Sequence, residues 1–236
     1  GLVDAWRAYV SGNHDSIVYY IAFEHRLPRS LLAVVVGVTL ALCGAVFQVL
    51  FRNPLATPYT LGISSGGALG ALIAIHLGLD ARLLGLSGVT LAAFFGAVAV
   101  IAVIFTFTRG TRRLTTNELL LAGVTLGLFC SGMMMLVTCL SNVRETFAIV
   151  RWMMGSLDTI GHTSLVSVLP LVVPAWGVLL LSARALNQYV LGDELAGTRG
   201  VNVVRLQVVC IVFASLATAA VVSVCGPIGF VGLVVP

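Results

Sequence analysis

The sequence of 236 residues contains no lysine, and only 9% of its residues are charged. A phosphate-binding loop of the Gly-x-x-x-x-Gly-Lys-Ser/Thr type requires a lysine, so an ATPase of that class is excluded from this chain. The 13 basic residues are all arginine and produce a net charge of +4. This is far less charge than the surface of an ordinary water-soluble domain carries.

Recognisable catalytic and metal-binding patterns are also lacking. The four histidines are scattered, and no Ser/His/Asp or His/Glu arrangement accompanies them. The five cysteines lie in uncharged stretches without Cys-x-x-Cys or Cys/His spacing, which is typical of small buried hydrophobic residues. We therefore expect no catalytic residue, metal site or cofactor, and an intramembrane enzyme ranks last among the candidate functions.

Long hydrophobic runs dominate what is present. The chain is 59% hydrophobic, with a mean hydropathy of +1.07. Six stretches contain no Asp, Glu or Arg: 30–51, 53–79, 83–108, 119–143, 159–183 and 206–236. Each exceeds the ~20 residues that a helix needs to cross ~30 Å of hydrocarbon. The sequence therefore predicts an all-α fold, a polytopic helical bundle in contact with membrane lipid and not with nucleic acid.

The chain divides into an extracytoplasmic segment, residues 1–29, and a transmembrane domain, residues 30–236. The first residues have neither a basic region nor an apolar run, so no signal peptide is expected. Residues 17–23 are rich in aromatic side chains and are expected at the membrane interface. Residues 144–158 mix apolar side chains with charged ones, which predicts a short amphipathic helix on the surface.

The arginines indicate an orientation. Arg109, Arg112 and Arg113 form a cluster beside a span, which favours that side as cytoplasmic. Alternation of the spans then places Arg26 and Arg29 outside, against the positive-inside rule, so these two arginines need another explanation.

Acidic residues are lacking inside the hydrophobic stretches. Proton- or sodium-coupled transporters usually place ionisable residues within the membrane. Here His76 is the only candidate for an ionisable residue within the membrane, and it lies near the end of its stretch, as an interfacial residue would. The energy for transport is therefore expected to come from outside the chain. An ion-coupled secondary transporter or a channel is the alternative that this lack disfavours.

The stretch FRNPLATPYTLGISSGGALGALIAIHLG, residues 51–78, interrupts the hydrophobic pattern. Pro54 and Pro58 prevent a continuous helix, and backbone groups freed in this way are tolerated only beside a cavity or other protein. The Gly/Ser run that follows removes side-chain bulk, which permits either close helix packing or a wide conduit. The same alternatives apply to the small residues Gly123, Gly127 and Ser131, spaced i, i+4, i+8.

Several long motifs resemble one family, in its order. RLPRSLLAVVVGVTLALCGAVFQVLFRNPLATPYTLGISSGGALG, NELLLAGVTLG, VRWMMGSL, LGDELAGTRGV and GPIGFVGLVVP are similar to segments of the FecCD-type permeases. These are the membrane subunits of type II ABC importers for iron-siderophores, haem and cobalamin, and have about ten transmembrane helices. The resemblance implies that this chain holds about six spans plus the start of a seventh, and is incomplete at both ends relative to the family.

The resemblance implies roles for named residues. Arg26 and Arg29 would face the periplasm and pair with glutamates of a substrate-binding protein; arginines that reach lipid headgroups are the alternative. A cytoplasmic gate is implied at Asn53, Pro54, Leu55, Thr116 and Asn117. Pathway-lining positions are implied at Gly66, Gly67, Gly123, Gly127 and Ser131.

Coupling to an ATPase is implied for a cytoplasmic helix expected over residues 193–201, whose acidic start suits the helix dipole. Its implied coupling residues are Gly192, Asp193, Glu194, Leu195, Ala196, Arg199 and Gly200. The chain departs from the family pattern at Arg199, where leucine is usual. Gly197 should also weaken the helix by ~1 kcal/mol relative to alanine.

The implied assembly is a homodimer of two permease copies with two ABC ATPase subunits and a periplasmic or lipoprotein substrate-binding protein. It would lie in the inner (plasma) membrane of a bacterium and import an iron-siderophore, haem or cobalamin-type chelate. The chain itself would be a transport subunit and not an enzyme, since ATP hydrolysis would occur on the separate ATPase. Specificity is expected to be a property of the binding protein.

Overall fold

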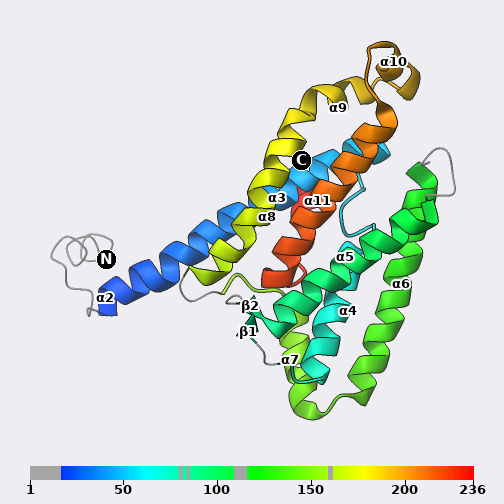
Figure 1. The fold of residues 1–236 in the computed structure, drawn as a ribbon. Coiled ribbons are helices and arrows are strands. Elements are labelled where there is room, and N and C mark those ends of the chain that lie inside the picture. Colours follow the sequence, from blue (N-terminus) through cyan, green and yellow to red (C-terminus); the bar gives the residue numbers. More distant parts are fainter. Residues whose placement is uncertain (1–16, 80–81, 84–85, 109–115, 159–161) are drawn as a thin grey trace.

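The computed structural model describes residues 17–79, 82–83, 86–108, 116–158 and 162–236, which form a bundle of helices (Figure 1). The described strands are β1 (Arg82–Leu83) and β2 (Leu86–Ser87), a short antiparallel pair. The helices are α2 (Ile17–Tyr19), η1 (Tyr20–Arg26), α3 (Leu27–Phe51), α4 (Ile63–His76), α5 (Gly88–Thr108), α6 (Thr116–Leu140), α7 (Val143–Met153), α8 (Thr163–Leu181), α9 (Ala183–Tyr189), α10 (Asp193–Thr198), α11 (Val203–Cys225) and α12 (Val231–Val234). The predicted all-α fold is confirmed.

Among the described residues, five helices are long and apolar enough to cross a membrane: Tyr20–Phe51, Gly88–Thr106, Glu118–Leu140, Thr163–Leu181 and Val203–Cys225. The second predicted stretch, 53–79, differs from the expectation because only its 14-residue part Ile63–His76 is helical. Residues 53–62 form successive turns instead, since the two prolines and the left-handed Gly62 prevent a helix there.

The first span begins earlier than residue 30. Helical structure starts at Ile17 and passes through the π-helix η1 into α3, so the predicted boundary between residues 29 and 30 lies inside a helix. Pro28 explains the π-helix. Its nitrogen cannot donate a hydrogen bond, and the wider turn before it, closed by the bond from the Leu27 N–H to the Ala22 carbonyl, accommodates its ring.

Helix α11 lies at the centre of the bundle and packs against α3, α4, α5 and α8. The buried positions of α3 recur every three or four residues, as in Leu32, Val36 and Leu40, and form the stripe that faces it. The buried part of α11 is rich in small residues: Ala214, Ser215, Ala217, Thr218, Ala219 and Ala220. Small side chains let helix backbones approach closely, which supplies the packing energy available inside a membrane.

Helices α4 and α5 cross at very close range. A Cβ atom built on Gly96 would lie 2.3 Å from the Gly66 carbonyl oxygen, and one built on Gly70 would lie 2.2 Å from the Ala92 carbonyl oxygen. Real Cβ atoms do not approach a backbone oxygen this closely. The glycines of α4 therefore allow two backbones to touch.

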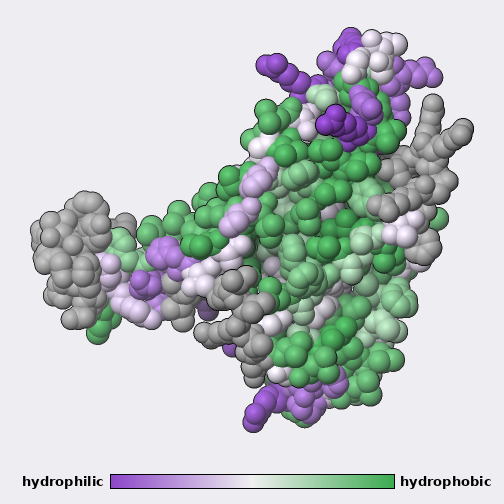
Figure 2. Space-filling model, viewed as in Figure 1, coloured by the Kyte–Doolittle hydropathy of each residue, from purple (hydrophilic) through white to green (hydrophobic). Residues whose placement is uncertain are grey.

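The bundle has two polar ends. The α10 end holds α9, α10, the last turn of α3 and the first turns of α6 and α11 (Figure 1). The α7 end holds α7, the β1–β2 pair and the last turn of α4. Figure 2 shows hydrophobic residues over the middle of the molecule and hydrophilic residues at both ends, as expected for helices that cross a membrane.

The amphipathic helix predicted over residues 144–158 is α7, which ends at Met153. It begins with a capping box, in which the Asn142 side chain accepts from the Glu145 N–H and the Glu145 side chain accepts from the Asn142 N–H. Phe147 is exposed and Ile149 is buried, as a helix on the surface requires. Gly155, with φ +66°, turns the chain away after the helix.

Candidate functional site

The predicted gate residues Asn53, Pro54 and Leu55 form a turn at the α10 end. The Asn53 side-chain oxygen accepts a hydrogen bond of 2.9 Å from the Leu55 N–H, and its own N–H donates to the Gln48 carbonyl at 3.1 Å. These bonds satisfy the backbone where the helix stops. The Leu55 side chain is left 68% exposed, so it projects from the molecule rather than packing into it.

The turn continues into a largely buried segment, residues 56–62. The Thr60 hydroxyl donates to the Thr57 carbonyl at 2.6 Å and accepts from the Thr57 N–H at 3.2 Å, while the Tyr59 hydroxyl donates to the Ile228 carbonyl. Non-helical backbone at this depth is tolerated because its polar groups are bonded inside the protein.

The structure brings helix α6 against this segment. A Cβ atom built on Gly123 would lie 2.6 Å from the Leu61 Cα atom. Thr116 and Asn117, the other predicted gate residues, form the first turn of α6, but their side chains lie outside the described part of the chain. The two predicted gate segments therefore belong to neighbouring elements at the same end of the bundle.

The predicted pathway positions have different surroundings. Gly66 and Gly67 are buried, and their nearest neighbours are Val100 and Gly96 of α5 for the first and Ala93 of α5 for the second. Within this chain their positions match the packing alternative, because another helix occupies the space beside them.

The small residues Gly123, Gly127 and Ser131 of α6 become less closely packed along the helix. Gly123 packs against the turn segment, and a Cβ atom on Gly127 would lie 3.7 Å from Gly62 Cα, in ordinary contact. Ser131 is exposed, and its hydroxyl donates to the Gly127 carbonyl at 2.9 Å. Of the five predicted pathway residues, Ser131 has the most open surroundings.

The predicted coupling residues lie around α10, at the tip of the α10 end (Figure 1). Glu194, Leu195 and Arg199 are exposed, whereas Ala196 is fully buried. The sequence predicts a helix that reaches residue 201, but α10 ends at Thr198. Gly200, with φ +84°, forms a left-handed C-terminal turn closed by the bond from the Val201 N–H to the Ala196 carbonyl. Gly192, with φ +124°, sets the start of the helix in a backbone conformation that favours glycine.

Sequence reasoning missed the contact that joins the gate turn to this helix. The Arg52 guanidinium donates to the Tyr189 carbonyl at 3.0 Å, pairs with the Asp193 carboxylate and lies 4.6 Å from the centre of the Tyr189 ring. Arg52 also has φ +46°, a conformation that costs a non-glycine residue roughly 1–2 kcal/mol. A sequence signal does exist, since an arginine occupies a helix-ending position where glycine is usual.

Arg26 and Arg29 lie at the other end of the first span from Arg52, and both are exposed. They are three residues apart, at the junction of η1 and α3, a spacing that places helical side chains on neighbouring positions of one face. Their geometry is compatible with both the docking role and the lipid-headgroup alternative.

His76 lies at the α7 end, as an interfacial residue should. Its Nδ1 atom is 2.9 Å from Glu145 Oε2 and 3.2 Å from the Ser141 hydroxyl, so it joins the end of α4 to α7 and to the residue that follows α6. The hydrogen bond from His76, together with that from the Asn142 backbone, lowers the pKa of Glu145 below its usual value.

This pair predicts a pH effect. A carboxylate with a lowered pKa stabilises the folded protein above its unfolded pKa, and the stabilisation is lost as pH falls through the folded pKa. We expect the thermal unfolding midpoint to fall more steeply in the wild type than in Glu145→Gln below about pH 4. Glu194→Gln, at an exposed glutamate, is the control and should follow the wild type. Identical profiles for all three proteins would contradict a stabilising role of the pair.

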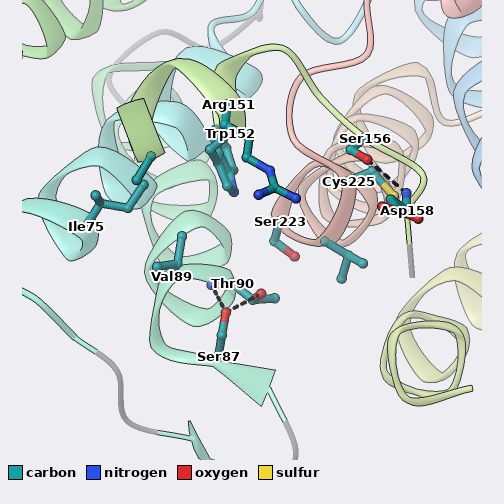
Figure 3. A pocket seen from close by; sticks show the side chains of 12 residues that line it. Ile75, Ser87, Val89, Thr90, Arg151, Trp152, Ser156, Asp158, Ser223 and Cys225 are labelled. Atoms are coloured by element: carbon teal, nitrogen blue, oxygen red, sulfur yellow. Dashed lines mark hydrogen bonds between the residues drawn. The ribbon is translucent and has the colours of Figure 1, made fainter. Parts of the chain in front are cut away.

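A pocket of about 400 Å³ opens beside α7 (Figure 3). Arg151 and Trp152 of α7, Thr90 of α5 and Ser223 of α11 line it together with Asp158. None of the residues predicted for function lines this pocket.

Comparison with known proteins gives the context for this geometry. The model of the FecCD transport family matches residues 2–236. The chain belongs to the FecCD transport family.

Two FecCD relatives and one solved structure illustrate the similarity. The chain is 40% identical over 225 residues to the hemin transport system permease protein HmuU of Yersinia pestis, covering 94% of this chain and 66% of that protein. It is 38% identical over 234 residues to the Fe(3+) dicitrate transport system permease protein FecC of Escherichia coli, covering 99% and 70%. An inward-facing structure of a metal-chelate type ABC transporter matches with a TM-score of 0.84 and 30% identity, covering 92% of this chain and 68% of that one. The FecCD chain thus spans about two thirds of the length of these proteins.

Proposed function

We propose that this chain is the permease part of an ATP-driven importer that moves an iron-siderophore, haem or cobalamin-type chelate across the inner membrane of a bacterium. The observation that carries the proposal is the match of residues 2–236 to the FecCD transport family. It is supported by five apolar spans in the described residues and by the printed names of the relatives, which include hemin and Fe(3+) dicitrate transport permeases.

The permease pairs with a second copy. Support comes from α6, of which only 11% of the span is buried within the chain. Leu121, Leu128 and Met135 of α6 are 69% to 72% exposed. An apolar face of this length needs lipid or another helix against it, and a second copy placed along α6 would set Ser131 between the two chains. In this arrangement the pathway runs between the copies.

The tip around α10 is the contact for an ABC ATPase, one for each permease copy. Exposed Glu194 and Leu195 project there, and buried Ala196 anchors the helix. ATP hydrolysis occurs on these separate subunits, and the permease itself is not an enzyme. At the opposite end Arg26 and Arg29 receive a substrate-binding protein.

A reconstitution experiment tests the function. The full-length protein is placed in lipid vesicles with its ATPase and binding protein, and uptake of haem, a ferric siderophore and cobalamin is measured. Uptake of one of these chelates that requires ATP and the binding protein is expected. Uptake driven by a proton or sodium gradient without ATP would overturn the proposal and favour the ion-coupled alternative.

The gate is proposed at Asn53, Pro54 and Leu55, together with Thr116 and Asn117. Replacing Leu55 by glycine removes a side chain that is 68% exposed at the turn and should widen the closed state. We expect leakage of chelate without ATP, or ATP turnover without transport, to increase severalfold.

The matched control for the gate is Leu77→Gly. Leu77 is 63% exposed and caps α4 at the α7 end, so the chemical change is the same at the opposite end of the bundle. It should not leak. Equal leakage in both variants, or none in Leu55→Gly, would remove Leu55 from the gate; Asn117→Gly then tests the first turn of α6.

A further inference from the structure

One contact joins the two segments that the proposed function treats separately, the gate turn and the coupling helix. Arg52 precedes Asn53 directly and Asp193 begins α10, although the two residues are 141 positions apart. Their side chains form an ion pair, and both remain partly exposed, 44% for Arg52 and 56% for Asp193. The contact lies on the surface of the α10 end, where a rearrangement meets little steric resistance.

Tyr189 contacts Arg52 on the buried side of the Arg52–Asp193 ion pair. The Arg52 guanidinium donates to its carbonyl and lies over its ring, while the Tyr189 hydroxyl donates to the Leu50 carbonyl at 3.3 Å. That hydroxyl also accepts from the Gln207 side chain at 3.0 Å. The last turn of α3, the end of α9, the start of α10 and the first turns of α11 therefore meet at one buried tyrosine.

The backbone conformation of Arg52 indicates that position 52 holds an arginine because of the contacts that its side chain makes. Its positive φ favours glycine, which would end α3 without strain. A glycine would also lose the carbonyl bond, the ion pair and the contact with the tyrosine ring. A planar guanidinium can make all three at once, whereas a lysine ammonium has no such fork.

We propose that Arg52 is the positioning residue through which α10 sets the conformation of the gate turn. The proposal rests on the proposed function, because it assumes that α10 receives the motion of the ATPase. A shift of α10 moves the Asp193 carboxylate relative to Tyr189, which ends α9, and the paired guanidinium follows the carboxylate. Arg52 is bonded covalently to Asn53, so the shift reaches the Asn53–Leu55 turn without passing through the core of the bundle.

The first test is transport per ATP hydrolysed in the reconstituted complex. Arg52→Gln and Asp193→Asn are each expected to lower this ratio roughly three- to tenfold while ATP turnover persists. The charge exchange Arg52→Asp with Asp193→Arg should restore part of the loss. Arg184→Gln is the matched control, since Arg184 is an exposed arginine of the neighbouring helix α9, and it should retain the wild-type ratio.

The second test does not depend on transport. Spin labels at Leu55→Cys and Leu195→Cys, in a chain with exposed Cys139 replaced by serine and diluted with unlabelled copies, report the separation of the turn and α10. We expect one narrow distance distribution, which Arg52→Gln broadens and Arg184→Gln does not. Arg52→Lys, which keeps the charge, replaces Arg52→Gln if that variant fails to fold, and broadening is again expected.

The outcomes separate the two proposals. No ATP-dependent uptake by the wild type would overturn the proposed function, and the spin-label result would still decide whether Arg52 holds the turn to α10. Wild-type uptake with an unchanged ratio in Arg52→Gln would overturn the positioning role. An equal loss in Arg184→Gln, or an unchanged distance distribution in Arg52→Gln, would likewise overturn it.

Discussion

Replacing Gly96 by leucine is expected to abolish assembly of the helix bundle. Even the first added carbon would lie 2.3 Å from the Gly66 carbonyl oxygen and 3.1 Å from the Gly70 Cα atom. Both neighbours are backbone atoms of α4, so no side chain can rotate away. Relief requires that α4 and α5 separate, and the extensive contacts between these two helices are then lost.

The size of this effect follows from a comparison between the cost of overpacking and the total stability of a folded protein. Overpacking of a core costs about 1–3 kcal/mol when side chains can adjust, and more when backbones must move. A folded domain has only about 5–15 kcal/mol of stability in total. We expect Gly96→Leu to yield little or no monodisperse protein in detergent, and Gly96→Ala to lower the thermal midpoint by several degrees.

Gly177→Leu is the matched control for the crossing. Gly177 lies in α8, and a Cβ atom there would meet nothing within 4 Å. Leucine also has a higher helix propensity than glycine, so this variant should be as stable as the wild type or slightly more so. A Gly96→Leu protein with the wild-type yield and midpoint would show that the α4–α5 backbones are not in contact.

Reversing both Arg26 and Arg29 to glutamate is expected to weaken docking of the substrate-binding protein on the order of 100-fold or more at low salt. If these arginines pair with glutamates of the binding protein as proposed, the reversal makes two attractive pairs repulsive. The difference between wild type and variant should shrink as ionic strength rises, because both arginines are exposed and the Debye length falls to ≈ 8 Å at 0.15 M. Surface plasmon resonance on the full-length protein in nanodiscs measures both quantities.

The control for docking changes the same net charge at the other end of the bundle. Arg184 and Arg205 are exposed residues of α9 and α11, and reversing both should leave docking unaltered. The lipid-headgroup alternative predicts a different result for Arg26 and Arg29. In that case the reversal lowers the yield of inserted protein, and the protein that does insert docks normally.

The sequence by itself determined the class of this protein. Long stretches without charge can be accommodated only as helices in hydrocarbon, where each backbone group must be bonded within its own segment. The all-α fold, the break at Pro54 and the amphipathic helix α7 follow from such local rules, and all three are present in the structure. The motifs also indicated the FecCD family, because they occur along the chain in the order that the family has them.

Helix limits depended on details that composition does not contain. Helical structure begins at Ile17, ahead of the first span, because a π-helix accommodates Pro28, and α10 ends at Thr198 because Gly200 adopts a left-handed conformation. In each case the helical conformation and its alternative at the helix end have similar local energies. Hydrophobicity predicts the existence of a helix more firmly than its last residue.

Only the tertiary structure decided what the small residues and the charges contact. The sequence left Gly66 open between packing and a conduit, and only the structure shows that the backbone of α5 lies beside it. The meeting of Arg52, Tyr189 and Asp193 was decided in the same way. These residues are distant in sequence, and no local rule relates them. They come together because buried stripes and small residues fix how α3, α9 and α11 pack, and that packing depends on the shape of all the helices at once.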